Sequence, residues 1–236
     1  MGDTKVVQQL VDLQLAEYAE STLGHVDLSL EALATYQEPN SVVDLGCGTG
    51  QVGRAAQMMG TDCIVSIYAG QVTPSPDTPN LRQMNALVNI DLPSESVRLL
   101  FSRNGPHLWC FNEEQARRLF QEINRIITSD GEARFHCPWF GFVQLRIAES
   151  LKAGEHKQRL QGVWRQLGKH PTDWRAALNA MNMTEKKLER AYPYLRQARD
   201  ESTRLLREWG YDIELVQHRK SPTDDKADYW CLQKTQ

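Results

Sequence analysis

The feature that most constrains the fold is the stretch at residues 42–53, whose sequence is VVDLGCGTGQVG. Its two valines, followed by Asp44 and Leu45, predict a short buried strand. Glycines at positions 46, 48 and 50 predict a turn that few other residues could form, and residues 55–59 predict a helix that ends at Gly60. A glycine turn between a strand and a helix exposes backbone amides to a ligand. The stretch therefore predicts a ligand-binding α/β unit.

Asp44 lies inside the end of this predicted strand, where a carboxylate is costly to bury unless it accepts hydrogen bonds or faces a cation. Residues 42–50 resemble the first motif of class I S-adenosylmethionine-dependent methyltransferases. The resemblance implies a seven-stranded Rossmann-like α/β sheet with helices on both faces. It also implies S-adenosyl-L-methionine as the cofactor and S-adenosyl-L-homocysteine as the product. The residues that it assigns to the methionine end of the cofactor are Asp44, Gly46, Cys47, Gly48 and Gly50.

A dinucleotide site is the alternative for the same loop, because residues 48–53 also satisfy the pattern G-x-G-x-x-G. That fingerprint requires an acidic residue about 20 positions further on, to bind the ribose hydroxyls. Residues 68–76 contain neither Asp nor Glu, and a nicotinamide site leaves Asp44 unexplained. The sequence therefore favours the methyltransferase hypothesis over a nicotinamide oxidoreductase.

The next two predicted strands depart from the methyltransferase pattern in part. Residues 63–68 predict a buried strand that ends at Tyr68, where the family normally has Asp or Glu. A phenol forms fewer hydrogen bonds to a ribose diol than a carboxylate does. Either the affinity for the cofactor is weaker, or Gln71 or Tyr68 substitutes for the carboxylate. Residues 69–80 predict a proline-rich loop, and residues 81–86 resemble the third strand of the family. By this resemblance Asn85 and Ala86 bracket the adenine.

The fourth strand, at residues 99–102, leads into the most informative loop after the glycine turn. Arg98 stands in place of the usual Asp at the start of this strand. Ligands bind at the carboxyl ends of the strands in open α/β sheets. We therefore expect Ser102 and Arg103 to contact the cofactor and Asn104 to contact the acceptor. His107 is the candidate general base, with a hydrogen-bonded structural histidine as the alternative.

The rest of the chain predicts a helical segment, a core and an insertion. Asn112 predicts the cap of a helix over residues 113–128, and residues 129–132 predict a turn before a fifth strand at residues 133–137. Residues 196–209, 212–218 and 228–234 predict a helix and an antiparallel strand pair. The predicted parts are an N-terminal helical segment (1–38), a cofactor-binding core (39–138), a helical insertion (139–192) and a completing helix and hairpin (193–236).

Two of these parts carry further substrate candidates. The N-terminal segment predicts helices at residues 4–20 and 28–36, with Tyr18 and His25 as candidate contacts. The insertion predicts helices at 141–160, 172–181 and 184–191, broken by Gly168, Pro171 and Pro193. We expect it to be a substrate lid that includes Trp139, with a structural or dimer-forming role as the alternative.

Composition limits the remaining possibilities. No apolar run approaches the roughly 20 residues that span a bilayer, and the first residues lack the apolar stretch of a signal peptide. Five cysteines form no C-x-x-C pair, and six histidines are scattered without ligand spacing, so we expect a cytoplasmic protein without a metal site. Residues 1–140 have a net charge of −8 and residues 141–236 a net charge of +5. This asymmetry is compatible with an anionic acceptor.

The sequence therefore predicts a methyltransferase that acts on a small-molecule or natural-product acceptor, with an O, N or C nucleophile left open. One alternative is a nucleic-acid or protein methyltransferase that uses the basic insertion. Another is a non-catalytic partner protein with a degenerate cofactor site, which Tyr68 and Arg98 suggest. The oligomeric state, including a homodimer, stays open.

Overall fold

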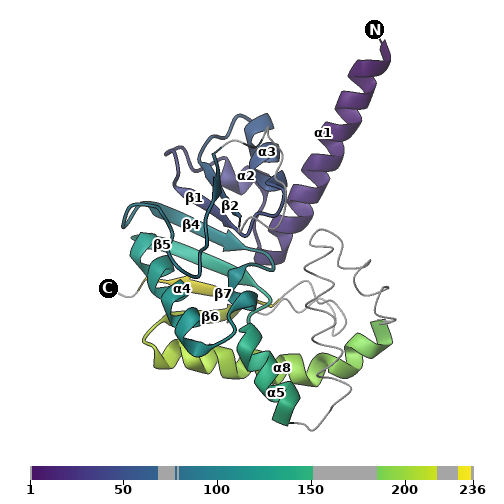
Figure 1. Cartoon of the computed structure of the whole chain (residues 1–236). Helices are drawn as coiled ribbons and strands as arrows, with labels where there is room; N and C mark the ends of the chain where they lie inside the picture. The colour runs from purple at the N-terminus through teal and green to yellow at the C-terminus, as the bar shows by residue number, and fades with distance from the viewer. Residues whose placement is uncertain (1, 69–77, 79, 151–184, 217–227, 235–236) are drawn as a thin grey trace.

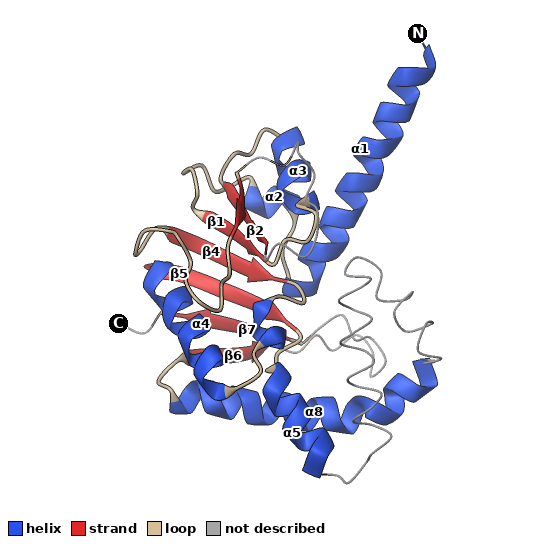
Figure 2. Cartoon of the chain, in the orientation of Figure 1, coloured by secondary structure: helices blue, strands red, loops and turns tan. Residues whose placement is uncertain are grey.

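A single seven-stranded sheet forms the centre of the computed structural model, in the strand order β3-β2-β1-β4-β5-β7-β6 (Figure 2). The structure describes residues 2–68, 78, 80–150, 185–216 and 228–234. The strands are β1 (Val42–Leu45), β2 (Ile64–Tyr68), β3 (Leu81–Gln83), β4 (Val97–Ser102), β5 (Ile127–His136), β6 (Asp212–Val216) and β7 (Tyr229–Gln233). β1 to β5 run parallel, and β7 is antiparallel to both β5 and β6. The predicted fold and C-terminal hairpin are confirmed.

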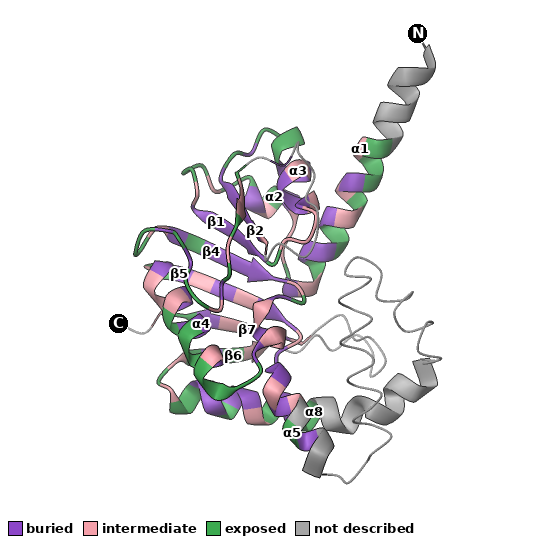
Figure 3. Ribbon diagram, viewed as in Figure 1, coloured by how far each residue is buried: buried purple, intermediate pink, exposed green. Residues whose placement is uncertain are grey.

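The central strands are buried on both faces, as Figure 3 shows for β1 and β2. β1 lies between β2 and β4, with Val43 paired to Val65 on one side and to Leu100 on the other. Strands buried on both faces need apolar residues at successive positions, which explains the continuous hydrophobic runs in the sequence. Asp44 interrupts this pattern within β1.

Helices cover the two faces and create two cores (Figure 1). The helices are α1 (Gly2–Leu23), α2 (Leu30–Leu33), α3 (Gln51–Met58), α4 (Glu113–Ile126), α5 (Gly141–Ser150) and α8 (Glu185–Glu208), with short 3-10 helices η1 (Gly24–Val26) and η2 (Pro106–Trp109). Val42 packs with α1, α2 and α3, whereas Val43 packs with α4, α5 and α8. This alternation follows from the period of two along a strand.

Helix α4 begins where the sequence predicts. The Oδ1 of Asn112 accepts a hydrogen bond from the backbone amide of Gln115 at 2.9 Å, which caps the helix. Glu113 and Glu114 occupy its first turn and pair with Arg117 and Arg118, four residues later. The acidic residues lie at the end of the helix dipole that favours negative charge.

Three element boundaries differ from the sequence prediction. The second N-terminal helix is limited to residues 30–33. No turn separates α4 from the fifth strand, because β5 begins at Ile127, which pairs with Val97 before the register shifts. The predicted helix break at Pro193 is wrong, since α8 runs through this residue. A proline removes one helical hydrogen bond, but the flanking turns can continue the helix.

Several predictions fall outside the described residues. They include most of the loop at 69–80, residues 151–184 of the insertion and the aromatic residues Trp164 and Trp174. The described start of the insertion is α5, and the lid hypothesis stays a prediction. None of the described helices is long and apolar enough to cross a membrane. The described residues also contain no group of three or more metal-binding side chains.

Candidate cofactor-binding site

The loop between β1 and α3 has the backbone conformation that its glycines predict. Gly46, Gly48 and Gly50 have φ values of +85°, +59° and +77°, which side chains other than glycine rarely adopt. The amides of Gly46 and Cys47 both donate to the carbonyl oxygen of Ile67, at 2.9 and 3.0 Å. The loop is therefore fastened to the carboxyl end of β2.

The glycines of this loop serve two different purposes. A Cβ atom on Gly46 would lie 3.0 Å from the Cα of Gly105, because the loop after β4 passes directly against it. A Cβ atom on Gly48 would meet nothing within 4 Å. Gly46 thus permits close packing of two loops, whereas Gly48 leaves bare backbone facing open space. That space lies at the carboxyl edge of the parallel strands, where ligands bind in open α/β sheets.

Asp44 is the charged group beneath this loop. Its side chain is 4% exposed, and burial raises the pKa of its carboxyl group from 3.8 to about 7. Within the described part of the chain, no group hydrogen-bonds to this carboxyl and no cation pairs with it. A buried carboxylate without such a partner is costly, and a cationic ligand would relieve that cost. Asp44 also contributes, after burial itself, to raising the pKa of the Cys47 thiol, so this thiol stays neutral.

Comparisons with known proteins agree with the fold. No family model matches the chain. A curated relative from Schizosaccharomyces pombe, named an uncharacterized methyltransferase, is 22% identical over 190 residues. The match covers 78% of this chain, which spans 64% of the length of the relative. The chain is therefore similar in sequence to a methyltransferase, and its sheet has the seven-stranded order described above.

Two solved structures align with nearly all of this chain. A protein from Methanococcus maripaludis, named a proposed S-adenosyl-L-methionine-dependent methyltransferase, has a TM-score of 0.47 and 16% identity, covering 97% of this chain and 91% of the other. A Thermotoga maritima methyltransferase, whose name proposes histamine N-methylation, has a TM-score of 0.43 and 14% identity, covering 98% and 96%. Nothing about the acceptor follows from likenesses at this level.

The residues predicted to contact ribose and adenine lie at the carboxyl ends of the neighbouring strands β2 and β3. Tyr68 is half-buried at the end of β2, and its carbonyl oxygen accepts from the amide of Met84 at 3.0 Å. Asn85 is exposed just after β3, with its Oδ1 accepting from the amide of Leu87 at 3.1 Å, and Ala86 is buried. The structure brings these positions together, while their contacts to adenosine stay predictions.

Ser102 and Arg103 connect parts of the fold. The Ser102 hydroxyl is fully buried and donates to the carbonyl oxygen of Leu45 at 2.7 Å. It ties β4 to β1, and the cofactor contact of Ser102 stays a prediction. The Nη1 of Arg103 donates to the Thr22 hydroxyl at 2.9 Å, and its Nε is buried without a partner among the described residues. Arg103 therefore fixes the end of α1 against the loop after β4.

His107 was the candidate general base, and the structure argues against this role. Its side chain is fully buried, and its Nε2 donates to the carbonyl oxygens of His136 and Cys137 at 3.0 and 3.1 Å. The imidazole packs against the rings of Phe135 and Trp230, and burial lowers its pKa to about 4. A neutral, buried imidazole that joins η2 to β5 is a structural group.

The other residues predicted to contact the substrate are distributed over different parts of the fold. Asn104 is exposed at the end of β4, with a φ of +55°. Trp139 is half-buried against the core that α4, α5 and α8 cover. Tyr18 is half-buried on α1, whose first half projects away from the sheet (Figure 1). Only Asn104 therefore lies in the loop that borders the glycine turn.

Sequence reasoning missed a polar cluster beside this loop. His136 and Cys137 end β5, and the ring of His25 lies edge-on to the ring of His136 with the centroids 4.7 Å apart. His136 alternates with apolar residues along β5, a pattern typical of a structural position, and it is buried. The sequence carries little signal for this cluster, because His25 and His136 are brought together by the packing of the N-terminal segment on β5.

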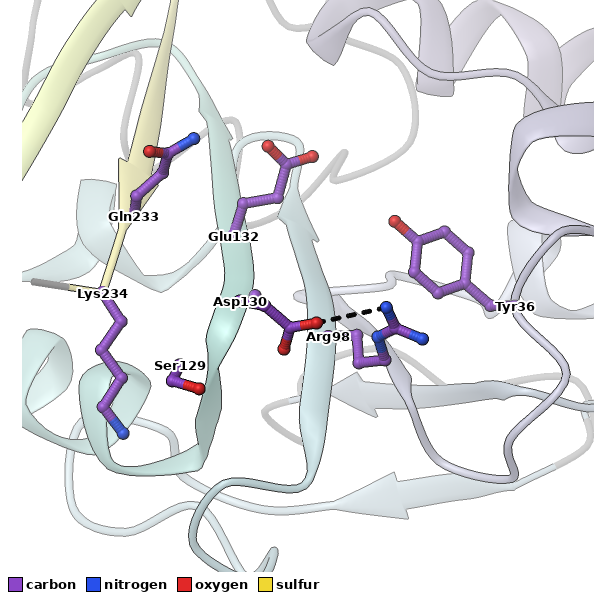
Figure 4. A pocket seen from close by; sticks show the side chains of 8 residues that line it. Tyr36, Arg98, Ser129, Asp130, Glu132, Gln233 and Lys234 are labelled. Carbon is purple, nitrogen blue, oxygen red and sulfur yellow. Dashed lines mark hydrogen bonds and ion pairs between the residues drawn. The ribbon is translucent and has the colours of Figure 1, made fainter. Parts of the chain in front are cut away.

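A polar cavity of about 360 Å³ lies at the opposite edge of the sheet, at the start of β4 (Figure 4). Arg98 and Asp130 form an ion pair there at 3.3 Å. This pair gives a structural role to Arg98, which stands where the family usually has Asp. Lys234, also in its wall, pairs with Glu95. The cavity is separate from the glycine loop, because the two lie at opposite ends of the parallel strands. Its lining residues are Tyr36, Arg98, Ser129, Asp130, Gly131, Glu132, Gln233 and Lys234.

Proposed function

We propose that the chain binds S-adenosyl-L-methionine on its glycine loop and transfers the methyl group to a small-molecule acceptor. The observation that carries the proposal is Asp44, a buried carboxyl without a described partner beneath an open glycine turn. The donor has a cationic amino group and a sulfonium, which suit this carboxylate. The open space beside the backbone of Gly48 supports the fit of the donor on this loop.

The chain's own residues would hold the donor by three means. The positive φ values of the loop let the methionine end approach the backbone closely, and Asp44 balances its charge. Tyr68 would offer a phenol to the ribose, and Asn85 an amide to the adenine. When bound, the donor supplies a methyl group that an acceptor takes by in-line displacement at carbon. The protein then orients the acceptor and excludes water, which can account for about 7–11 kcal/mol of the barrier.

A small-molecule acceptor is favoured over a nucleic acid by the charges of the C-terminal half. Arg199 pairs with Asp200 and Asp228, and Arg146 and Arg204 also pair with carboxylates. Cations that are already paired attract a phosphate backbone weakly. The salt dependence of polyanion binding tests the alternative, because a nucleic-acid enzyme would bind more tightly as salt is lowered.

Calorimetric titration with S-adenosylmethionine and S-adenosylhomocysteine tests the proposed function. We expect the wild type to bind with micromolar affinity. In Asp44→Asn the affinity should fall at least tenfold, which corresponds to a loss of about 1.4 kcal/mol of binding free energy. Asp62→Asn is the matched control, since Asp62 is exposed before β2. Failure of the wild type to bind either compound would refute the proposal. It would favour instead the non-catalytic partner protein with a degenerate site.

A further inference from the structure

The guanidinium group of Arg103 has no counter-ion among the described residues. Its Nη1 donates to the Thr22 hydroxyl at 2.9 Å, and its Nε is buried without a partner. Arg125, Arg134 and Arg199 are also buried or half-buried, and each of them pairs with a carboxylate. A partly buried charge without such a pair is costly, and a bound anion would relieve that cost. Arg103 is therefore a candidate anion-binding group.

The outer end of this guanidinium group is open to solvent. Arg103 is half-buried as a whole, and Asn104 beside it is exposed. Within the described part of the chain, Nη2 donates to no group, and the nitrogen that is buried without a partner is Nε. Nη2 is therefore the nitrogen that an incoming ligand would meet.

Arg103 is held in a fixed position at the carboxyl edge of the sheet. It directly follows Ser102, whose buried hydroxyl donates to the carbonyl oxygen of Leu45 at 2.7 Å. The contact with Thr22 fixes the far end of the Arg103 side chain to α1. A side chain that is already fixed loses little conformational entropy when it binds a ligand. Arg103 is thus preorganised for recognition.

The loop that carries Arg103 touches the loop on which the donor is proposed to bind. The register between β1 and β4 pairs Asp44 with Phe101, two residues before Arg103. Gly105, two residues after Arg103, has its Cα 3.0 Å from the position of a Cβ on Gly46. Arg103 therefore lies between two direct contacts with the β1 strand and its glycine loop.

The order of the strands places Arg103 on the side where an acceptor would approach. In the proposed complex the donor extends from β1 across the ends of β2 and β3, where Tyr68 and Asn85 lie. β4 is the neighbour of β1 in the opposite direction. The end of β4 is thus the neighbouring position that the adenosine part of the donor leaves uncovered.

The donor carries a carboxylate of its own, which is the competing ligand for Arg103. This carboxylate and the ammonium group are attached to the same carbon, so a donor that binds Asp44 through its ammonium presents both charges there. Burial raises the pKa of the Asp44 carboxyl, and no nearby cation lowers it. Arg103 is therefore too far from Asp44 to share one amino-acid group with it, which favours a carboxylate from another molecule.

We propose that Arg103 binds a carboxylate of the acceptor and thereby selects a small carboxylic acid as the substrate. The inference rests on the proposed function and specifies its acceptor class. A guanidinium group forms charge-assisted hydrogen bonds to a carboxylate, and one cation balances its single charge. A phosphate monoester has nearly two negative charges at neutral pH and would need a further cation.

The test compares the full-length wild type with Arg103→Gln, which removes the charge, and Arg103→Lys, which keeps it. Arg118→Gln is the matched control, because Arg118 forms an exposed pair with Glu114 on α4. Calorimetric titration with S-adenosylhomocysteine comes first. Methyl transfer from tritiated S-adenosylmethionine is then measured with a panel of small hydroxy- and aminocarboxylates, each accompanied by its uncharged primary amide.

We expect all four proteins to bind S-adenosylhomocysteine with the same affinity, and the wild type to methylate at least one carboxylate in preference to its amide. Arg103→Gln should lower kcat/KM for that carboxylate by about 10–100-fold, chiefly through KM, and should change the value for the amide little. Arg103→Lys should lose less, because an ammonium group keeps the charge but not the planar fork of donors. A purely structural role for Arg103 would lower both values equally.

Three results would overturn the inference while the wild type still binds the donor. The first is a tenfold or greater loss of S-adenosylhomocysteine affinity in Arg103→Gln, because the guanidinium group would then serve the donor, as the sequence predicts, or the fold. The second is a kcat/KM for the carboxylate that is unchanged or falls no more than that for the amide. The third is a wild type that methylates no carboxylate of the panel.

Failure of the wild type to bind S-adenosylhomocysteine is a separate outcome. It refutes the proposed function and this inference with it.

Discussion

Replacing Asp44 by Asn should make the unliganded protein more stable and the donor bind more weakly. The carboxyl group is buried, and its pKa of about 7 lies well above its ordinary value of 3.8. An asparagine side chain has nearly the same shape but does not ionise. The substitution therefore separates the charge of Asp44 from its packing within β1.

The structure sets the size and sign of the stability change. In the unfolded chain the carboxyl ionises near pH 3.8, whereas in the folded chain it keeps its proton to about pH 7. The folded state binds more protons between these values, so wild-type stability falls as pH rises through this window. A difference of about three pKa units corresponds to about 4 kcal/mol over the whole window. From about pH 5 to about pH 8 the stability advantage of Asp44→Asn should therefore grow by about 3 kcal/mol.

Urea unfolding of the unliganded proteins at several pH values measures this difference. Asp62→Asn serves as the control, because Asp62 is exposed and its substitution should leave the free energy of unfolding unchanged at every pH. Calorimetry with S-adenosylhomocysteine on the same samples gives the opposite trend. The affinity of the wild type should increase up to about pH 7, since the ammonium group of S-adenosylhomocysteine favours ionised Asp44, and the affinity of Asp44→Asn should not change over this range.

A stability difference between Asp44→Asn and the wild type that is constant from acid to alkaline pH would refute this reasoning. It would mean that the carboxyl finds a compensating partner in the unliganded protein. Equal donor affinity in the two proteins would refute the second half, namely that Asp44 balances the charge of the donor.

Three further substitutions test separate parts of the structure. Gly48→Ala should lower the free energy of unfolding by about 1–2 kcal/mol because of the positive φ, and should weaken S-adenosylhomocysteine binding in calorimetry, as the new Cβ enters the open space. Because burial lowers the pKa of His107, the free energy of unfolding of the wild type should fall by about 3 kcal/mol relative to that of His107→Gln as pH falls from 6.5 to about 4. Urea midpoints of the two proteins that change in parallel across this range would contradict the prediction. Arg199→Met should destabilise by about 3 kcal/mol in urea, because the buried guanidinium pairs with Asp228, and a loss below about 0.5 kcal/mol would mean that the pair is dispensable.

Local physical rules made much of the fold readable from the sequence. The two valines before Asp44, the alternating glycines and the Asn112 cap each act within a few residues, and each occurs where predicted. The seven-stranded sheet with helices on both faces followed from the resemblance to a family. Boundaries were less predictable, because β5 starts at Ile127 through pairing with Val97, a contact that no local pattern encodes.

The sequence by itself determined the glycine loop and the position of Asp44 beneath it, since both belong to one continuous segment whose conformation depends on its own residues. Only the tertiary structure decided where the polar side chains near this loop lie. His107, expected at the carboxyl edge, turns into the core, and Cys137 at the end of β5 contacts both His136 and Asn104. The reason is physical: the direction of a side chain at a strand end depends on which face neighbouring elements cover, and the N-terminal segment that covers β5 lies far away in the sequence.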